Sequence, residues 1–346
     1  MNFLNKIFNG VQITPTITEF IEPTKTIQNK AIGEEKDENG NVKPIRVFKY
    51  ASDIHLEMRD SLEKMKNLKG IYQFEKKPNH RYFLALVGDI GSPIIHENLL
   101  LEFLKLCSNQ YERVFYVAGN HEYYNRTDVS IPDIVYKIRE LIAVNNLSNV
   151  HFLDNQVYQL DEFKIIGSTL WSYVDQDHEP DVSRCLNDYR LISVPLEQMC
   201  GDEGLPDSTR RLLVTDTNRF HKCGVNFIKY HIGIRDKYGP AANQNTGIPQ
   251  PPCIVLTHHA PQFNDQKNQT YTSHPKYLKS DRIGQAFSTD LSDIIAPPIS
   301  VWIFGHTHFN TEYSYNGVKI LANQHGYEFG EDIDECKFNS NRYFIF

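Results

Sequence analysis

The chain has 346 residues, of which 40% are hydrophobic, and its 36 basic and 43 acidic residues give a formal net charge of −7. This amount of apolar material can fill a substantial core, so a disordered chain is excluded, and the length suits one large or two ordinary domains. The acidic balance and the lack of a basic stripe argue against an extended nucleic-acid groove, because that kind of binding depends on neutralising phosphates.

Six cysteines are scattered along the chain without a Cys-x-x-Cys pair. This pattern indicates reduced thiols in a reducing compartment. No run reaches the roughly 18 apolar residues that a membrane span needs, and the first residues make a poor signal peptide. We therefore expect a cytoplasmic protein without a membrane partner, with a weakly amphipathic anchor at residues 1–8 as the alternative. The sequence does not indicate an oligomeric state.

The first half of the chain alternates strand-like and helix-like segments. Residues 1–45 have little periodicity and predict an N-terminal arm, with a turn at Asn39-Gly40 that is typical of a tight hairpin. The alternation of strands and helices predicts an α/β layered fold. In order, we expect a strand over 46–52, a helix over 56–68, a strand over 82–87, a helix over 96–107, a strand over 114–118 and a helix from Pro132 to about Val144.

The second half begins differently and then returns to the sheet pattern. Short strands in quick succession predict an antiparallel or mixed stretch, and the weak periodicity of residues 172–250 predicts an insertion with a helix or two within 210–238. We expect one domain over 46–346. Its remaining elements are strands within 151–154, 156–160 and 163–172, a strand over 253–256, a loop over 262–284, a helix over 285–295, and strands over 299–304, 318–322 and 343–346.

Five of the predicted strands end in a polar turn. The carboxyl ends of strands are where open α/β sheets bind their ligands. In the third turn, Gly119 can adopt backbone angles that other residues avoid, and an amide, an imidazole and a carboxylate follow it as candidate ligands. The turns are Asp53-Ile54-His55, Gly88-Asp89, Gly119-Asn120-His121-Glu122, His258-His259 and Gly305-His306-Thr307-His308.

These turns offer carboxylate and amide oxygens and imidazole nitrogens, but no thiolate. Such a ligand set suits manganese, iron, zinc or nickel. It fills two sites if one carboxylate bridges, and two ions about 3.5–4 Å apart can hold a phosphoryl group. The histidines elsewhere in the chain are interpreted as structural. His325 is intermediate, because it follows a strand that can end near the same place.

The ordered set of Asp-x-His, Gly-Asp, Gly-Asn-His-Glu, His-His-Ala-Pro and Gly-His-Thr-His resembles the calcineurin-like metallophosphoesterase superfamily. It runs from Asp53 to His308, which is most of the chain, and the flanking phrases are similar to uncharacterised single-domain members. The resemblance implies a four-layer αββα sandwich of two mixed β-sheets flanked by helices. It also implies a dinuclear metal site at the carboxyl ends of the strands.

The resemblance also assigns roles to individual residues. His121 would lie outside the metal shell and either stabilise the phosphoryl oxygens or protonate the leaving group, while His259 is an alternative to its neighbour His258. The metal ligands that it implies are Asp53, His55 and His308 for one ion, Asn120, His258 and His306 for the other, and Asp89 as the bridge between two ions of manganese, iron or zinc.

The chain departs from the family pattern in one place. Many protein-phosphatase members have a second Asp three residues after the bridging Asp, where it pairs with the histidine of the Gly-Asn-His turn, but here that position is Ser92. His121 therefore lacks that orienting partner. The arginines that clamp phosphate cannot be placed by motif, and Arg190 in the insertion is the candidate for substrate binding.

We interpret the sequence as that of a metal-dependent hydrolase that splits a phosphate ester with a hydroxide bridging two metal ions. Its partner would be a small phosphorylated substrate or a phosphodiester. One alternative is a nuclease or nucleotide phosphodiesterase of the same superfamily, which salt-sensitive binding of nucleic acid would favour. Another is a catalytically silent binding or scaffold protein on this fold. The apparently complete ligand set argues against that loss of function, and the absence of bound transition metal would favour it.

Overall fold

The computed structural model describes residues 40, 42–196, 208–234, 250–277, 281–327 and 336–346. The chain divides into two units, Met1–Lys43 and Pro44–Phe346. Nearly all of the first unit lies outside the described residues, so the expected arm and its hairpin at Asn39-Gly40 stay predictions. The fold described below is that of the second unit.

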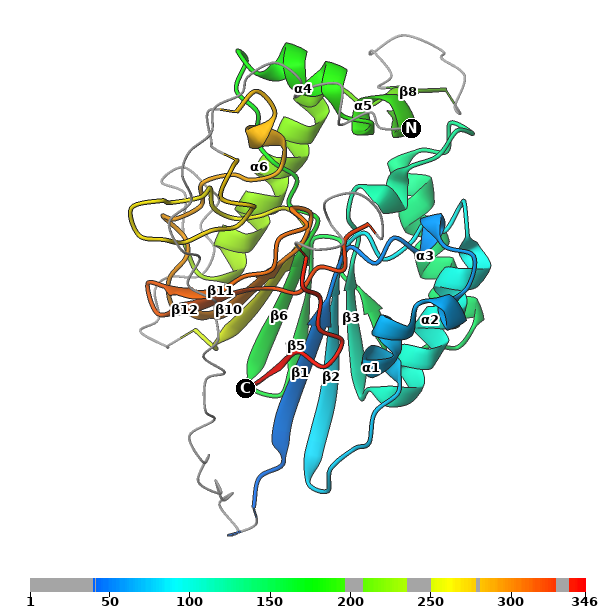
Figure 1. The fold of residues 1–346 in the computed structure, drawn as a ribbon, viewed down its shortest axis with the longest axis vertical. Coiled ribbons are helices and arrows are strands. Elements are labelled where there is room, and N and C mark those ends of the chain that lie inside the picture. Colours follow the sequence, from blue (N-terminus) through cyan, green and yellow to red (C-terminus); the bar gives the residue numbers. More distant parts are fainter. Residues whose placement is uncertain (1–39, 41, 197–207, 235–249, 278–280, 328–335) are drawn as a thin grey trace, which may run out of the picture. The chain divides into compact units, whose positions relative to one another are not determined.

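The first sheet has five strands in the order β13-β1-β2-β3-β4. The run from β1 to β4 is parallel, and β13 pairs with β1 in the antiparallel direction (Figure 1). The carboxyl ends of four neighbouring strands therefore meet at one edge. The strands are β1 (Ile45–Ala51), β2 (His80–Val87), β3 (Arg113–Val117), β4 (Val150–Phe152) and β13 (Tyr343–Ile345).

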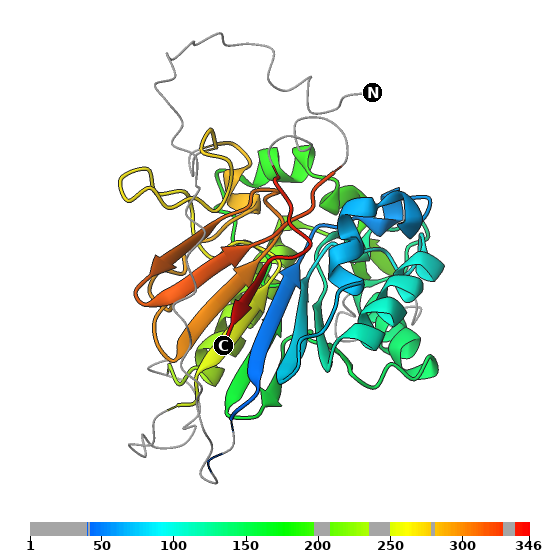
Figure 2. The ribbon, with the colours of Figure 1, turned by 60° about the horizontal axis from the view of Figure 1, so that its bottom comes forward.

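The second sheet has six strands in the order β11-β12-β10-β9-β6-β5. Its four central strands are parallel, and the two edge strands are antiparallel to their neighbours (Figure 2). Both sheets are therefore mixed. The strands are β5 (Gln156–Leu160), β6 (Phe163–Ser168), β9 (Cys253–Thr257), β10 (Ile299–Phe304), β11 (Glu312–Tyr315) and β12 (Val318–Ala322).

The two sheets share an apolar core. Along β1, Phe48 and Tyr50 belong to this shared core, while the alternating residues Val47 and Ala51 belong to the cluster on the other face. This is the period of two that a strand imposes on its side chains. The shared core also contains residues of the second sheet such as Ile254. The parallel strands are buried on both faces, and for this reason their sequences are almost continuously apolar.

Helices cover the outer face of each sheet. The helices α1 (Lys69–Tyr72), α2 (Glu97–Gln110) and α3 (Ile131–Val144) pack on the first sheet, and α6 (Val214–His231) packs on the second (Figure 1). The expected αββα sandwich of two mixed sheets is confirmed. No helix in the described part of the chain is long and apolar enough to span a membrane.

The described part of the predicted insertion holds small elements that the sequence did not indicate. They are α4 (Glu179–Cys185), α5 (Asp188–Leu191), and the antiparallel pair of β7 (Ser193–Pro195) and β8 (Thr209–Arg211). A small apolar cluster joins this region to residues 283–287.

Two helix predictions are wrong. The segment 56–68 forms three 3₁₀ turns, η2 (Leu56–Met58), η3 (Leu62–Lys64) and η4 (Lys66–Leu68), and only η6 (Gly284–Ala286) forms around the start of 285–295. In both segments the regularly spaced apolar residues are buried. Their spacing therefore reflects burial in the core and does not indicate an α-helix. Around Ser288, backbone groups bond to Ala260 and Pro261 instead of to each other.

Candidate active site

The five polar turns meet where the carboxyl ends of the two sheets face each other. Because both sheets are parallel at their centres and pack face to face, their ligand-bearing ends lie on the same side. The first sheet supplies Asp53 and His55 after β1, Asp89 after β2, and Asn120 and His121 after β3, and the second supplies His258 after β9 and His306 and His308 after β10.

The backbone of these turns is unusual. Five of the predicted ligands have positive φ, a conformation that costs energy for residues other than glycine. Such strain persists only where the surrounding fold enforces it, and it is concentrated at functional sites. The five are Asp53 (54°), His55 (53°), Asp89 (51°), His306 (72°) and His308 (49°).

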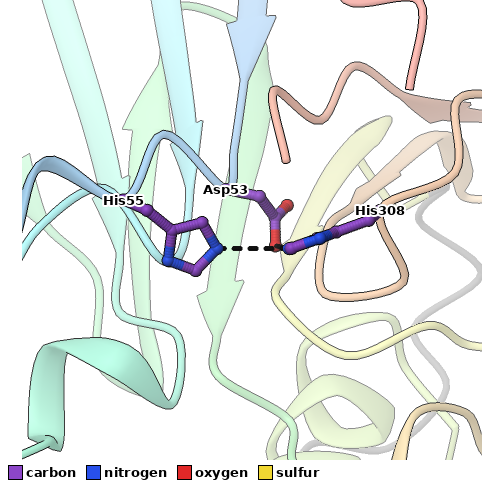
Figure 3. Close-up of side chains that lie close together, drawn as sticks. All are labelled: Asp53, His55 and His308. Carbon is purple, nitrogen blue, oxygen red and sulfur yellow. Dashed lines mark hydrogen bonds and ion pairs between the residues drawn. The ribbon is translucent and has the colours of Figure 1, made fainter. Parts of the chain in front are cut away.

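Asp53, His55 and His308 form one cluster, in which one ligand atom from each lies within 4.8 Å of the others. The Nε2 atoms of the two histidines are 3.1 Å apart, and His308 Nε2 is 3.5 Å from Asp53 Oδ1. Figure 3 shows the three side chains pointing toward one another. Lone pairs that converge in this way fit a metal ion.

Asp89, His258 and His306 form a second cluster of the same size. His258 Nε2 lies 3.3 Å from Asp89 Oδ2 and 3.1 Å from Asn120 Oδ1. Asp89 Oδ2 is also 3.9 Å from His55 Nε2, so this oxygen lies between the two clusters. In the described part of the chain, the buried Nε2 of His306 has no hydrogen-bond partner. A metal ion would use this lone pair.

The two histidines of the second cluster have opposite pKa shifts. Burial lowers the pKa of His258, but the Asp89 carboxylate outweighs it and raises the pKa to about 9. His258 Nδ1 lies 3.0 Å from the Val87 carbonyl and can donate to it, which leaves Nε2 to face two oxygens. Burial and the neighbouring histidines hold the pKa of His306 well below its usual range. The residues present therefore fit divalent ions.

His121 is held on several sides. Its Nδ1 is 2.9 Å from Glu57 Oε1, its backbone N–H donates to Asp89 Oδ1 at 2.8 Å, and its ring stacks on Tyr124 at 4.1 Å between centroids. Its Nε2 is 3.3 Å from the Tyr327 hydroxyl. Burial lowers the pKa of His121, but the Asp89 and Glu57 carboxylates outweigh it and raise the pKa.

Sequence reasoning missed Glu57 as a partner of His121. Its Oε1 is 2.9 Å from the Nδ1 atoms of both His55 and His121. Burial raises the pKa of Glu57, but the two histidines outweigh it and lower the pKa to about 2. The Ser92 hydroxyl instead accepts hydrogen bonds from the backbone N–H groups of Ile94 and Ile95, each at 3.2 Å. The signal in the sequence was the Glu two residues after His55.

Sequence reasoning also missed Asp188, which lies two residues before Arg190. Its Oδ1 accepts from Asn120 Nδ2 at 2.9 Å and from the Tyr124 hydroxyl at 2.5 Å. These bonds direct the Asn120 amide so that its oxygen faces His258. The Arg190 guanidinium donates to the carbonyl of Arg184, and its role in substrate binding stays a prediction.

Glu122 is a cross-link within the first sheet, although its turn made it a candidate ligand. It accepts from the backbone N–H groups of Asp89, Ile90 and Gly119 at 2.7–2.9 Å and from the Tyr116 hydroxyl at 2.9 Å. The expectation that Gly119 adopts backbone angles that other residues avoid was also wrong. Gly119 does not have positive φ, but a Cβ there would lie 2.2 Å from Asp89 Oδ1.

The two remaining histidine candidates lie beside the clusters. His259 is buried, its ring centroid lies 4.2 Å from that of His306 with the rings tilted by 39°, and its Nδ1 is 3.3 Å from the Thr169 carbonyl. His325 is buried, with Nε2 2.8 Å from Asn67 Nδ2 and Nδ1 2.9 Å from the Gly326 carbonyl. Neither belongs to a metal-binding group found in the described part of the chain.

Comparisons with known proteins agree with this geometry. A family model described as calcineurin-like phosphoesterase matches residues 47–310, a range that includes all five turns. An uncharacterized protein of Acanthamoeba polyphaga mimivirus is 34% identical over 285 residues, which is 82% of this chain and 92% of the relative. A crystal structure of phosphopantetheinyl hydrolase from Mycobacterium tuberculosis aligns over 83% of this chain and 91% of its own, with a TM-score of 0.52 and 14% identity. At that identity the likeness concerns the fold alone.

Proposed function

The chain belongs to the calcineurin-like phosphoesterase family, and from that premise we propose that it hydrolyses a phosphate ester with two divalent metal ions bound between its sheets. The observation that carries the proposal is the convergence of ligand atoms from both sheets into two adjacent clusters. The buried, unpartnered Nε2 of His306 and the short distance between His55 Nε2 and His308 Nε2 support it further.

We assign one residue set to each ion, with manganese, iron or zinc as the metals. Once bound, the ions would supply Lewis-acid charge that stabilises the phosphoryl oxygens and activates water. In this assignment Asp53, His55 and His308 hold one ion, Asn120, His258 and His306 hold the other, and Asp89 lies between them.

His121 is the catalytic residue of this proposal. Its Nε2 is directed away from Glu57 and toward the Tyr327 hydroxyl, and the neighbouring carboxylates raise its pKa over the opposing effect of burial. In the reaction, the oxygen of water bonds to phosphorus and the bond to the leaving oxygen breaks. The proton on His121 passes to that leaving oxygen, while the proton of the water passes to solvent. General acids of this kind contribute roughly 10²–10⁴-fold to the rate.

The test uses an aryl phosphate monoester and the matching diester, each assayed after chelation and again with Mn²⁺ restored. We expect turnover to disappear with chelation and to return with manganese, and the monoester-to-diester ratio identifies the substrate class. Asp89→Asn should lower both metal content and turnover. The matched control is Asp293→Asn, because Asp293 is exposed and forms an ion pair with Lys229.

Three results would count against the proposal. Turnover that persists in chelator, or full metal content and activity in Asp89→Asn, would contradict the metal assignment. Two bound metal ions without turnover of either ester would favour a binding or scaffold role on the same fold.

A further inference from the structure

Glu57 is a buried carboxylate of the site that is not among the assigned metal ligands. Its side chain is 4% exposed, and its Oε1 lies 2.9 Å from the Nδ1 atoms of both His55 and His121. In the described part of the chain, its buried Oε2 has no hydrogen-bond partner. Burying a carboxylate is costly unless hydrogen bonds compensate, so the two imidazole contacts account for its presence here.

The shared oxygen places one proton of each ring on Nδ1, and the acid form of His121 carries its second proton on Nε2. A carboxylate only accepts hydrogen bonds, so His55 and His121 must both donate from Nδ1. Each Nε2 then faces the site. For His55 that atom is 3.1 Å from His308 Nε2 and 3.9 Å from Asp89 Oδ2, and for His121 it is 3.3 Å from the Tyr327 hydroxyl.

The two rings also touch each other. The centroids of His55 and His121 are 4.4 Å apart with an edge-on angle of 73°, so the edge of one ring packs on the face of the other. The turn after β2, where related phosphatases carry the orienting Asp, offers Ser92, whose hydroxyl is occupied by backbone N–H groups. The carboxylate comes instead from the turn after β1.

We propose that Glu57 is a positioning residue that orients a metal-binding histidine, His55, and the proton donor, His121, through one shared oxygen. Proteins fix the tautomer of a histidine ligand with a carboxylate or carbonyl that accepts a hydrogen bond from the ring nitrogen facing away from the metal. Here one such partner serves two histidines with different tasks. This inference rests on the proposed function, since it takes the roles of His55 and His121 from it.

Two substitutions separate positioning from packing. Glu57→Leu keeps a similar volume and removes the acceptor, whereas Glu57→Gln keeps an oxygen but loses the charge that strengthens both hydrogen bonds. The matched control is Glu63→Gln, because Glu63 is exposed in the next turn. Metal content is measured for every variant at saturating Mn²⁺.

The first readout does not depend on activity. Long-range ¹H–¹⁵N spectra of the metal-free full-length chain report which ring nitrogen carries the proton. We expect the neutral forms of His55 and His121 to carry their proton at Nδ1 in the wild type and in Glu57→Gln, and to lose this preference in Glu57→Leu. A preference for Nδ1 retained by both neutral rings in Glu57→Leu would overturn the proposal.

The second readout is the leaving-group dependence of the metal-restored enzyme. Loss of an oriented acid should slow phenyl phosphate roughly 10²-fold in Glu57→Leu and should change 2,4-dinitrophenyl phosphate little, because that leaving group needs no proton. Glu57→Gln should lie between Glu57→Leu and the wild type. An equal loss for both esters at unchanged metal content would show that Glu57 does not orient His121 as the acid, and would overturn the proposal.

The same experiments distinguish this inference from the proposed function. A wild-type protein without turnover would contradict the proposed function, while the ring spectra would still test the orientation of the histidines. If Glu57→Leu fails to fold, the rates of Glu57→Gln and Glu63→Gln with the two esters test the role of Glu57 instead. Identical kinetics in that pair would overturn the role of Glu57.

Discussion

Tyr327 covers the site from the segment after β12. Its ring centroid is 4.5 Å from those of both His55 and His308, and its hydroxyl is 3.3 Å from His121 Nε2. It therefore lies against two predicted metal ligands and the predicted proton donor at once. A phosphoryl group bound between these residues would meet the Tyr327 hydroxyl.

We predict that Tyr327→Phe lowers kcat/KM while the metal content stays unchanged. Losing one hydrogen bond to substrate costs about 0.5–1.5 kcal/mol, which corresponds to roughly 2–13-fold. Steady-state kinetics at saturating Mn²⁺ would measure the effect, with Tyr136→Phe as the control because Tyr136 is 66% exposed on α3. Equal kcat/KM values in the two variants would show that the hydroxyl does not contact substrate.

Glu122 joins the turn after β2 to the turn after β3. Its two oxygens receive four hydrogen bonds, three of them from backbone N–H groups. One of those groups belongs to Asp89, the predicted bridging ligand. The carboxylate thus holds two ligand-bearing turns in one arrangement.

We predict that Glu122→Gln destabilises the metal-free protein. The amide NH₂ would have to face backbone N–H donors, and a buried donor left unsatisfied costs about 1–3 kcal/mol. Urea unfolding in chelator would measure this loss, and Tyr116→Phe, which removes only one of the four bonds, should cost less. If Glu122 were a metal ligand instead, unfolding in chelator would be unchanged and only the metal content would fall.

The site takes its residues from both sheets and joins them. One cluster takes Asp53 and His55 from the first sheet and His308 from the second, and the other takes Asp89 from the first and His258 and His306 from the second. A metal ion in either cluster would therefore link the sheets at their carboxyl ends, beyond the apolar core that they share.

We predict that Mn²⁺ raises the melting temperature of the chelated protein in a concentration-dependent way. An ion that binds only the folded chain stabilises it by about 2.7 kcal/mol at a hundred times its Kd. Calorimetry across a Mn²⁺ titration would measure the shift, which His306→Ala should reduce and His80→Ala, outside both clusters, should not. An equal shift in His306→Ala would exclude His306 as a ligand.

The strands of the two sheets were largely predictable, because runs of buried apolar residues are a local property of the chain. The helix predictions over 56–68 and 285–295 failed for a tertiary reason. In both segments the spacing of buried residues looked helical, but the backbone around Ser288 bonds to Ala260 and Pro261. The first segment leaves His55 in a left-handed conformation and proceeds by 3₁₀ turns.

The sequence by itself determined the five polar turns, because each consists of a strand and the few residues that follow it. It could not identify the groups that orient the site. Glu57 and His121 are 64 residues apart, Asp188 and Asn120 are 68 apart, and Tyr327 and His121 are 206 apart. Only the packing of the sheets and of the insertion brings these partners within hydrogen-bond distance, since no local pattern links residues so far apart along the chain.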